Sequence, residues 1–158
     1  MKLIKYIFIT TFLLTNIYAN KLIIDAEKFE LNEKTGSTVF TGNVKMQRGD
    51  DRIDAGLIEI YTSEMDDKGV REMKKFIATG NVYFTVYTKE KIYQGKGDKL
   101  VYNPKEMKYT IIGNGLVEEK IEGTKLYGET IYLDEQSGEA KIKGTKKKPV
   151  RFIMKIKE

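Results

Sequence analysis

The sequence Thr41-Gly42-Asn43-Val44 organises the interpretation of the whole chain, because the same four residues return at positions 79–82. A looser copy, Ile-Gly-Asn-Gly, spans residues 112–115, and Lys-Gly-Thr at 143–145 is a fainter fourth copy. Polar and apolar residues alternate on both sides of each glycine, which predicts a β-strand with one crowded position. The glycines lie 38, 33 and 31 residues apart. A period of about 30 residues is typical of stacked repeats.

A second motif lies between these glycines. A small residue is followed by apolar residues three and five positions later, as in Ala55 with Ile58 and Ile60. The same spacing recurs from Ala26, Gly97 and Gly128. The step of three breaks strict alternation by one residue, as a β-bulge does. Each repeat is therefore expected to contain two strand regions.

The strands are expected to be short and joined by turns, since Val, Ile, Tyr, Phe and Thr are frequent and turn residues recur at intervals of about 8–12 residues. The longest interruption is residues 62–75, with its tip at 66–69. The predicted strand regions are 22–31, 38–46, 53–61, 76–87, 92–102, 109–121, 126–133 and 141–156. Consecutive hairpins make neighbouring strands antiparallel, and stacked repeats leave two open ends. The sequence thus predicts an all-β, repeat-built, folded-over sheet.

The first residues have the pattern of a targeting segment. Lys2 and Lys5 precede a mostly apolar run at 6–14, and Ala19 offers a small residue for cleavage. This predicts a signal peptide at residues 1–19, followed by one exported domain at 20–158. The alternative is a retained anchor, although the run is shorter than the roughly 20 residues that cross a bilayer.

Several kinds of chemistry are excluded by composition. The chain has no cysteine and no histidine, so disulfides and Ser-His-Asp or Cys-His catalysis are absent. We expect no metal and no cofactor. Asp25, Asp54 and Asp98 recur at equivalent places and could suit a glycosidase, but solvated strand ends explain them better. The sequence therefore predicts a protein that is not an enzyme.

Charge is unevenly distributed along the chain. The segment 141–158 has a net charge of +7, whereas residues 20–140 carry −4. Lys146, Lys147 and Lys148 could attract lipid head-group phosphates or an anionic membrane. They could equally protect an edge strand from indiscriminate pairing. Nucleic acid is not an expected partner, because the chain carries an export signal.

Alternation places one set of apolar side chains on the inner side of the sheet. An ordinary dry core would explain each of them, but a stripe repeated in every layer could also form a continuous trough for acyl chains. The candidate groove residues are Phe40, Val44, Met46, Ile58, Ile60, Phe76, Val82, Phe84, Ile111, Val117, Ile131 and Leu133.

Taken together, these motifs resemble the OstA-like family, whose LptA-like members are periplasmic lipopolysaccharide transport proteins. The resemblance covers residues 21–145 and rests on the order of its motifs. These are the signal segment, Leu-Ile-Ile-Asp-Ala-Glu at 22–27, the glycine motifs at 40–44 and 76–82, and the strands at 95–100 and 126–133.

The resemblance implies a β-jellyroll, open at both ends, that shields acyl chains and bridges the inner and outer membranes during outer-membrane assembly. Its implied partners are lipopolysaccharide, an LptC-like inner-membrane extractor, an LptD-like outer-membrane translocon and further copies stacked head to tail. The edges at 22–26 and 150–156 would carry the stacking.

Three alternatives remain open at this stage. The chain could be an LptC-like, membrane-anchored partner if the signal is retained. It could be a closed periplasmic β-domain that binds protein or glycan through Tyr83, Tyr87 and Tyr93. It could also be a small β-helical glycosidase, which requires two facing carboxylates in a groove.

Overall fold

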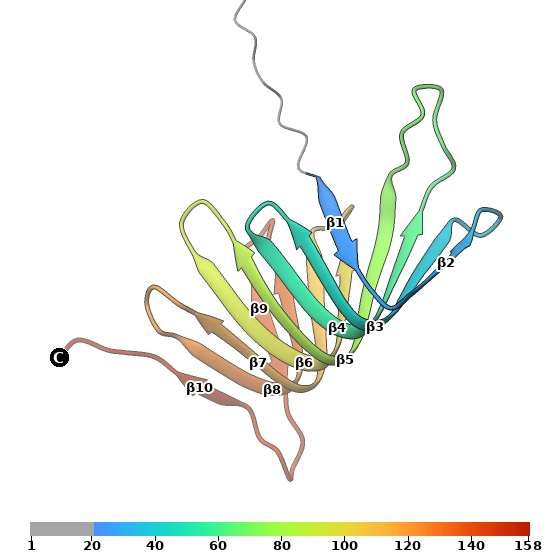
Figure 1. Ribbon diagram of the computed structural model, residues 1–158. Coiled ribbons are helices and arrows are strands. Elements are labelled where there is room, and N and C mark those ends of the chain that lie inside the picture. Colours follow the sequence, from blue (N-terminus) through green and yellow to red (C-terminus); the bar gives the residue numbers. More distant parts are fainter. Residues whose placement is uncertain (1–20) are drawn as a thin grey trace, which may run out of the picture.

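The computed structural model describes residues 21–158, which form ten β-strands in a single antiparallel sheet (Figure 1). The predicted signal peptide at 1–19 lies outside the described residues. No helix of the described part is long and apolar enough to cross a membrane. The strands are β1 (Leu22–Asp25), β2 (Lys28–Asn32), β3 (Ser37–Arg48), β4 (Asp51–Thr62), β5 (Met73–Tyr87), β6 (Ile92–Asn103), β7 (Lys108–Glu119), β8 (Lys125–Asp134), β9 (Ala140–Lys143) and β10 (Arg151–Ile153).

Each long strand bends near its middle, where the pairing register shifts. In β5, for example, Gly80 and Asn81 both have positive φ (87° and 46°) and together face the single residue Asp98 of β6. The Gly-Asn pairs of β3 and β7 have the same conformation. Glycine and asparagine adopt this left-handed region more readily than other residues. The repeated motif is therefore the corner at which each strand turns.

Because the corners align, the sheet folds along one line into two arms (Figure 1). We call this line the spine and the opposite, open side the mouth. The first arm runs from β1 through one half of each long strand to β10, and the second arm runs from β2 through the other halves to β9. Neither end of the stack carries a further layer in the described chain.

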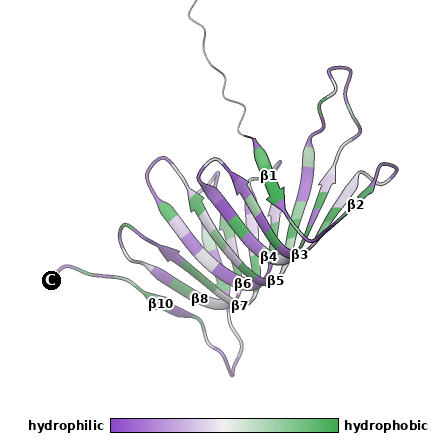
Figure 2. Cartoon of the chain, in the orientation of Figure 1, coloured by the Kyte–Doolittle hydropathy of each residue, from purple (hydrophilic) through white to green (hydrophobic). Residues whose placement is uncertain are grey.

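The core lies between the arms. Hydrophobic and hydrophilic residues alternate along the strands (Figure 2), so each strand sends one set of side chains inward. On the second arm, the residues nearest the spine are cross-strand partners from one end of the sheet to the other. This row is Phe29, Phe40, Ile58, Ala78, Leu100, Ile111, Ile131 and Ile142.

Glycines of the first arm lie directly against these side chains, which occupy the space that a Cβ would take. A Cβ added at Gly97 would lie 2.6 Å from Cγ2 of Ile111, and one at Gly115 would lie 3.1 Å from Cδ1 of Ile131. Gly97 belongs to the second sequence motif and Gly115 to the first, so both motifs need a small residue where the opposite arm packs directly against the backbone. The sheet is closed along the spine.

The predicted all-β, antiparallel, open-ended architecture is confirmed, as is the turn at the tip of the 62–75 interruption, which extends the β4–β5 hairpin beyond the sheet (Figure 1). Two of the predicted strand regions are divided in the structure. Residues 22–31 form two strands, since Glu27 leaves the ladder at the corner and its N–H bonds the carbonyl of Gly42 at 3.1 Å. Residues 141–156 also form two strands, which are separated by a loop at 144–150.

Candidate functional site

The structure brings all twelve candidate groove residues into one interior cluster. Nine are buried, and Phe40, Met46 and Leu133 are partly buried against them. Alternation therefore identified the inward face correctly. Their contact with lipid stays a prediction.

These residues divide by their depth. Val44, Ile58, Val82, Ile111 and Ile131 lie near the spine and are at most 1% exposed. Side chains of the second arm leave no room for even a Cβ on the first-arm glycines at this depth, so a ligand could enter only by separating the arms. The deep residues form a dry core.

An open space lies at the mouth, in the half of the molecule nearer the C-terminal end of the stack. It is a cavity of about 880 Å³ between the arms, within the range of about 300–1,000 Å³ that is usual for ligand pockets. Three of the candidate residues, Phe84, Val117 and Leu133, line it.

The sequence interpretation missed six other large lining residues. They are Val86, Tyr87, Tyr93, Met107, Tyr109 and Leu126. Extending the alternation to the strand ends places Val86 beside Phe84 and Tyr109 beside Leu133, so the signal for these two was present. The alternative of a closed domain that binds through surface tyrosines requires Tyr93 to be exposed, but Tyr93 is partly buried and packs against the core.

The rim of the cavity is charged, and most of its charges are negative. Lys89 and Lys91 contribute the positive charges. The acidic lining residues are Glu90, Glu119, Glu122, Asp134, Glu135 and Glu139. The site thus combines apolar walls with a hydrated, predominantly acidic rim, an arrangement suited to an amphiphile whose apolar part is inserted.

Two stacked tyrosines interrupt the apolar wall on the second arm. The rings of Tyr102 and Tyr109 lie 4.2 Å apart between centroids. Burial raises the pKa of both hydroxyls, so they remain neutral at physiological pH. Burial also raises the pKa of Glu135, against the opposing influence of the Tyr109 hydroxyl and the Arg48 charge.

Glu119 fixes the β7–β8 turn beside the cavity. Its carboxylate, in a residue that is only 5% exposed, accepts hydrogen bonds from the backbone N–H groups of Ile121 (2.8 Å) and Glu122 (2.6 Å). Burial by itself would raise the pKa of this carboxyl group, but these N–H groups and the Lys91 charge bring the pKa below its usual value. The charged form therefore stabilises the rim.

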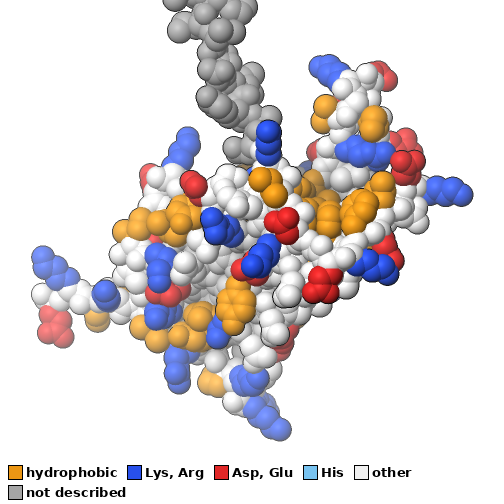
Figure 3. All heavy atoms as spheres, viewed as in Figure 1, with side chains coloured by type: hydrophobic (Ala, Val, Ile, Leu, Met, Phe, Trp, Pro, Cys, Tyr) orange, Lys and Arg blue, Asp and Glu red, His pale blue; other side chains and the backbone are white. Residues whose placement is uncertain are grey.

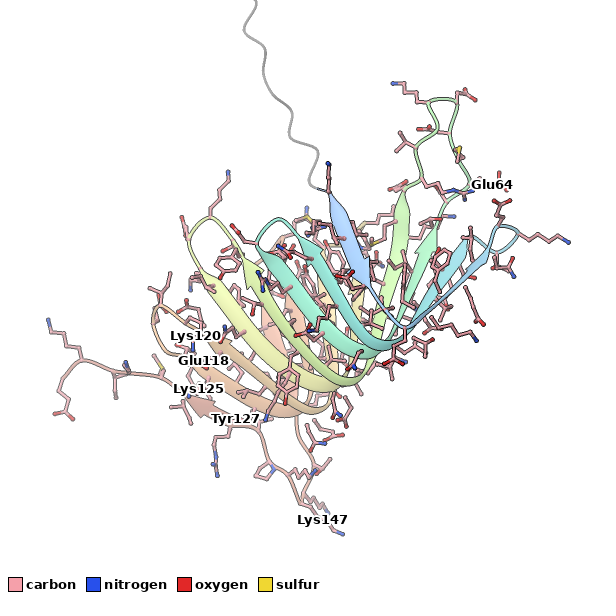
Figure 4. All side chains as sticks on the ribbon, viewed as in Figure 1. Glu64, Glu118, Lys120, Lys125, Tyr127 and Lys147 are labelled. Carbon is pink, nitrogen blue, oxygen red and sulfur yellow. The ribbon has the colours of Figure 1, made fainter. Side chains whose placement is uncertain are left out.

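The structure does not bring the three lysines at 146–148 to the cavity. They lie in the loop between β9 and β10, which projects on the spine side (Figure 4). Lys148 donates a hydrogen bond from Nζ to Oδ1 of Asn114 at the β7 corner (2.8 Å). A head group above the mouth would not meet these lysines.

The recurring acids Asp25, Asp54 and Asp98 are all exposed and lie outside the cavity lining. Within residues 21–158, no cluster of acidic side chains could hold a metal ion. The two facing carboxylates that a glycosidase requires are not provided by these three residues.

The chain is similar to known transport proteins. A family model described as "LptA/(LptD N-terminal domain) LPS transport protein" matches residues 23–139. A solved structure of LptH from Pseudomonas aeruginosa, titled the LptA homologous periplasmic component of a lipopolysaccharide transport device, has a TM-score of 0.68. The two chains share 16% identity over 87% of this chain and 96% of LptH, so this likeness shows a common fold. No curated protein sequence matches the chain.

Proposed function

The chain belongs to the LptA/(LptD N-terminal domain) family of lipopolysaccharide transport proteins, and from this premise we propose that it shields the acyl chains of lipopolysaccharide in the cavity at its mouth. The observation that carries this assignment is an apolar cavity of about 880 Å³ between two arms that are closed along the spine. Phe84, Val117, Leu126 and Leu133 would contact the acyl chains. The family consists of transport proteins, and we assign no reaction to this chain.

The energetics of such a site favour transient shielding. Each methylene group transferred from water contributes about 0.8 kcal/mol, so ten buried methylenes contribute about 8 kcal/mol. An open mouth lets the polar part of the lipid stay in water. Because binding of this kind has no preferred direction, net transport would require energy from another component of the pathway.

The unpaired edges support head-to-tail association with further copies. At one end, β1 is hydrophobic along most of its length (Figure 2), and Phe29 and Leu31 of β2 are 58% and 56% exposed. At the other end, Phe152 of β10 is 54% exposed. These residues continue the inward rows, so a second copy would extend the core. The +7 charge of residues 141–158 against −4 for residues 20–140 would add electrostatic attraction between copies.

We place the protein in the periplasm, between an LptC-like inner-membrane partner and an LptD-like outer-membrane partner. The family assignment and the sequence pattern of residues 1–19 support this location. An LptC-like, anchored role would require that this segment be retained.

Photocrosslinking in cells tests the cavity. A photoreactive residue at Leu126 or Leu133 should capture lipopolysaccharide, because both side chains line the cavity. The matched control is Tyr83, which is 56% exposed and points outward from the strand that carries Phe84. If Leu126 and Leu133 capture no more lipid than Tyr83 in folded, exported protein, the proposal fails.

A further inference from the structure

Exposed apolar side chains gather at the C-terminal end of the first arm, in the β7–β8 turn and in the segment that runs from β10 to the C-terminus (Figure 1). Ile121 in the β7–β8 turn is 65% exposed, and Ile153 in β10 is 44% exposed. After β10 the chain continues with Met154 and Ile156, which are 52% and 76% exposed. Lys155 and Lys157 alternate with them. Four aliphatic residues in water are unfavourable, which indicates a partner.

The pairing register makes this region continuous. Leu116 of β7 is opposite Tyr127 of β8, which is opposite Arg151 of β10. In the next row, Lys125 is opposite Ile153. The aliphatic part of Lys155 reaches the β7–β8 turn, where its Cε lies 3.5 Å from the position of a Cβ at Gly123. We call this surface the C-terminal outer patch; it comprises Leu116, Lys120, Ile121, Lys125, Tyr127, Arg151, Ile153, Met154, Lys155, Ile156 and Lys157.

The charges of the patch are almost all positive. Its acidic neighbour on the sheet, Glu118, is already paired with Lys120 at 3.4 Å and with Lys125 at 3.8 Å. Figure 4 shows these three side chains together beside β8 and β10. Hydrophobic and basic side chains are intermixed over this end of the molecule (Figure 3). The surface therefore offers apolar contact and positive charge in the same place.

We propose that the C-terminal outer patch binds the surface of an anionic lipid bilayer. Aliphatic and tyrosine side chains can enter the interfacial region while lysine and arginine contact lipid phosphates. Basic residues beside an anionic membrane each contribute favourable electrostatic energy. This role goes beyond cargo shielding, since none of the patch residues lines the cavity.

A second copy stacked end to end would use only the part of the patch at 151–157, which lies at the strand edge. Leu116, Lys120, Ile121, Lys125 and Tyr127 would remain free. Stacking pairs the strand edges, whereas Leu116, Ile121 and Tyr127 lie on the outer face and its turn. The outer face of the second arm is a natural control. It also carries lysines and the apolar residues Ile112 and Tyr132, which are 38% and 39% exposed, but Lys143 lies over the Tyr132 ring at 5.7 Å.

Vesicle sedimentation tests the proposal with the purified full chain. The vesicles contain phosphatidylcholine alone or mixed with phosphatidylglycerol. We expect binding to the mixed vesicles only, weakened by salt because screening shortens the range of these charges. Lys120→Gln combined with Lys125→Gln should weaken binding about fivefold for each charge removed. Ile121→Ser with Ile156→Ser should weaken it by at least tenfold.

The matched control is Lys99→Gln with Lys143→Gln on the second arm, which should bind as the unmodified protein does. Circular dichroism and lipopolysaccharide crosslinking at Leu133 show that each variant is folded and that the cavity is intact. Equal binding to neutral vesicles, or equal loss in both pairs of lysine variants, overturns the proposal. So does a patch variant that alters self-association while vesicle binding is unchanged, since that result identifies a protein interface.

Discussion

The corner glycines offer the sharpest test of how the sheet folds. Gly80 and Gly113 occupy equivalent corners with φ of 87° and 81°, but their surroundings differ. A Cβ at Gly80 would meet nothing nearer than 3.7 Å, and its closest neighbour is Gly56. A Cβ at Gly113 would lie 2.9 Å from the Cβ of Asp98 and would also overlap its carboxylate.

The expected costs follow from these two environments. Alanine in the left-handed region costs about 1–2 kcal/mol, and the lower entropy of the unfolded chain offsets about 0.4–1 kcal/mol of this. Gly80→Ala should therefore destabilise the protein by about 1 kcal/mol. Gly113→Ala should lower the free energy of unfolding by about 1–3 kcal/mol more than Gly80→Ala does, because steric overlap with Asp98 adds to the same backbone strain.

Asp98→Gly removes the overlapping atoms and gives Gly113 the neighbour that Gly80 already has. In the double variant, the cost of Gly113→Ala should fall to that of Gly80→Ala. The coupling energy between the two positions is measured by equilibrium urea unfolding of the unmodified protein, the two single variants and the double variant. The hydrogen bond from Asn114 to Asp98 is lost in both proteins that carry Asp98→Gly, so its contribution cancels. If Gly113→Ala costs the same as Gly80→Ala, or if Asp98→Gly does not relieve it, the steric account of the corner is wrong.

Three further predictions concern the core, the rim and the cavity. Ile131→Ala, at a side chain that is 0% exposed, should lower the free energy of unfolding by about 2–5 kcal/mol. Ile112→Ala on the outer face should change it by less than about 0.5 kcal/mol, and equal losses in urea unfolding would contradict the closed spine. Glu119→Gln should destabilise the protein at neutral pH, because the lowered pKa of Glu119 means that its charged form is favoured by folding. That stabilisation is present above the unfolded pKa of about 4.3 and is lost as the pH falls through the folded value, so thermal unfolding curves of the two proteins should converge in acid; a constant difference at every pH would refute the role of the charge. Leu133→Trp should weaken lipopolysaccharide capture at Leu126 by about tenfold, which is the effect of excluding two methylenes, and undiminished capture in a folded variant would place the acyl chains elsewhere.

The sequence by itself determined the fold class and the inward face. Period-two alternation depends only on the geometry of an extended chain, so Phe84 and Ile131 could be assigned to the interior without knowing which strands pair. The repeated Gly-Asn motif likewise marked the corners of β3, β5 and β7, and the crowding expected at its glycine is present at Gly42 and Gly113. At Gly80 the added Cβ has room, and the glycine is required there by its positive φ.

Only the tertiary structure decided where the interior is closed and where it is open. Ile111 and Ile131 fill the space above glycines that lie more than ten residues away in the chain, and such contacts depend on how the two arms approach each other. The same approach leaves the cavity at the mouth and puts the loop of Lys147 on the opposite side (Figure 4). Alternation assigns a side chain to a face, but the separation of two faces is set by packing between residues that are distant in sequence.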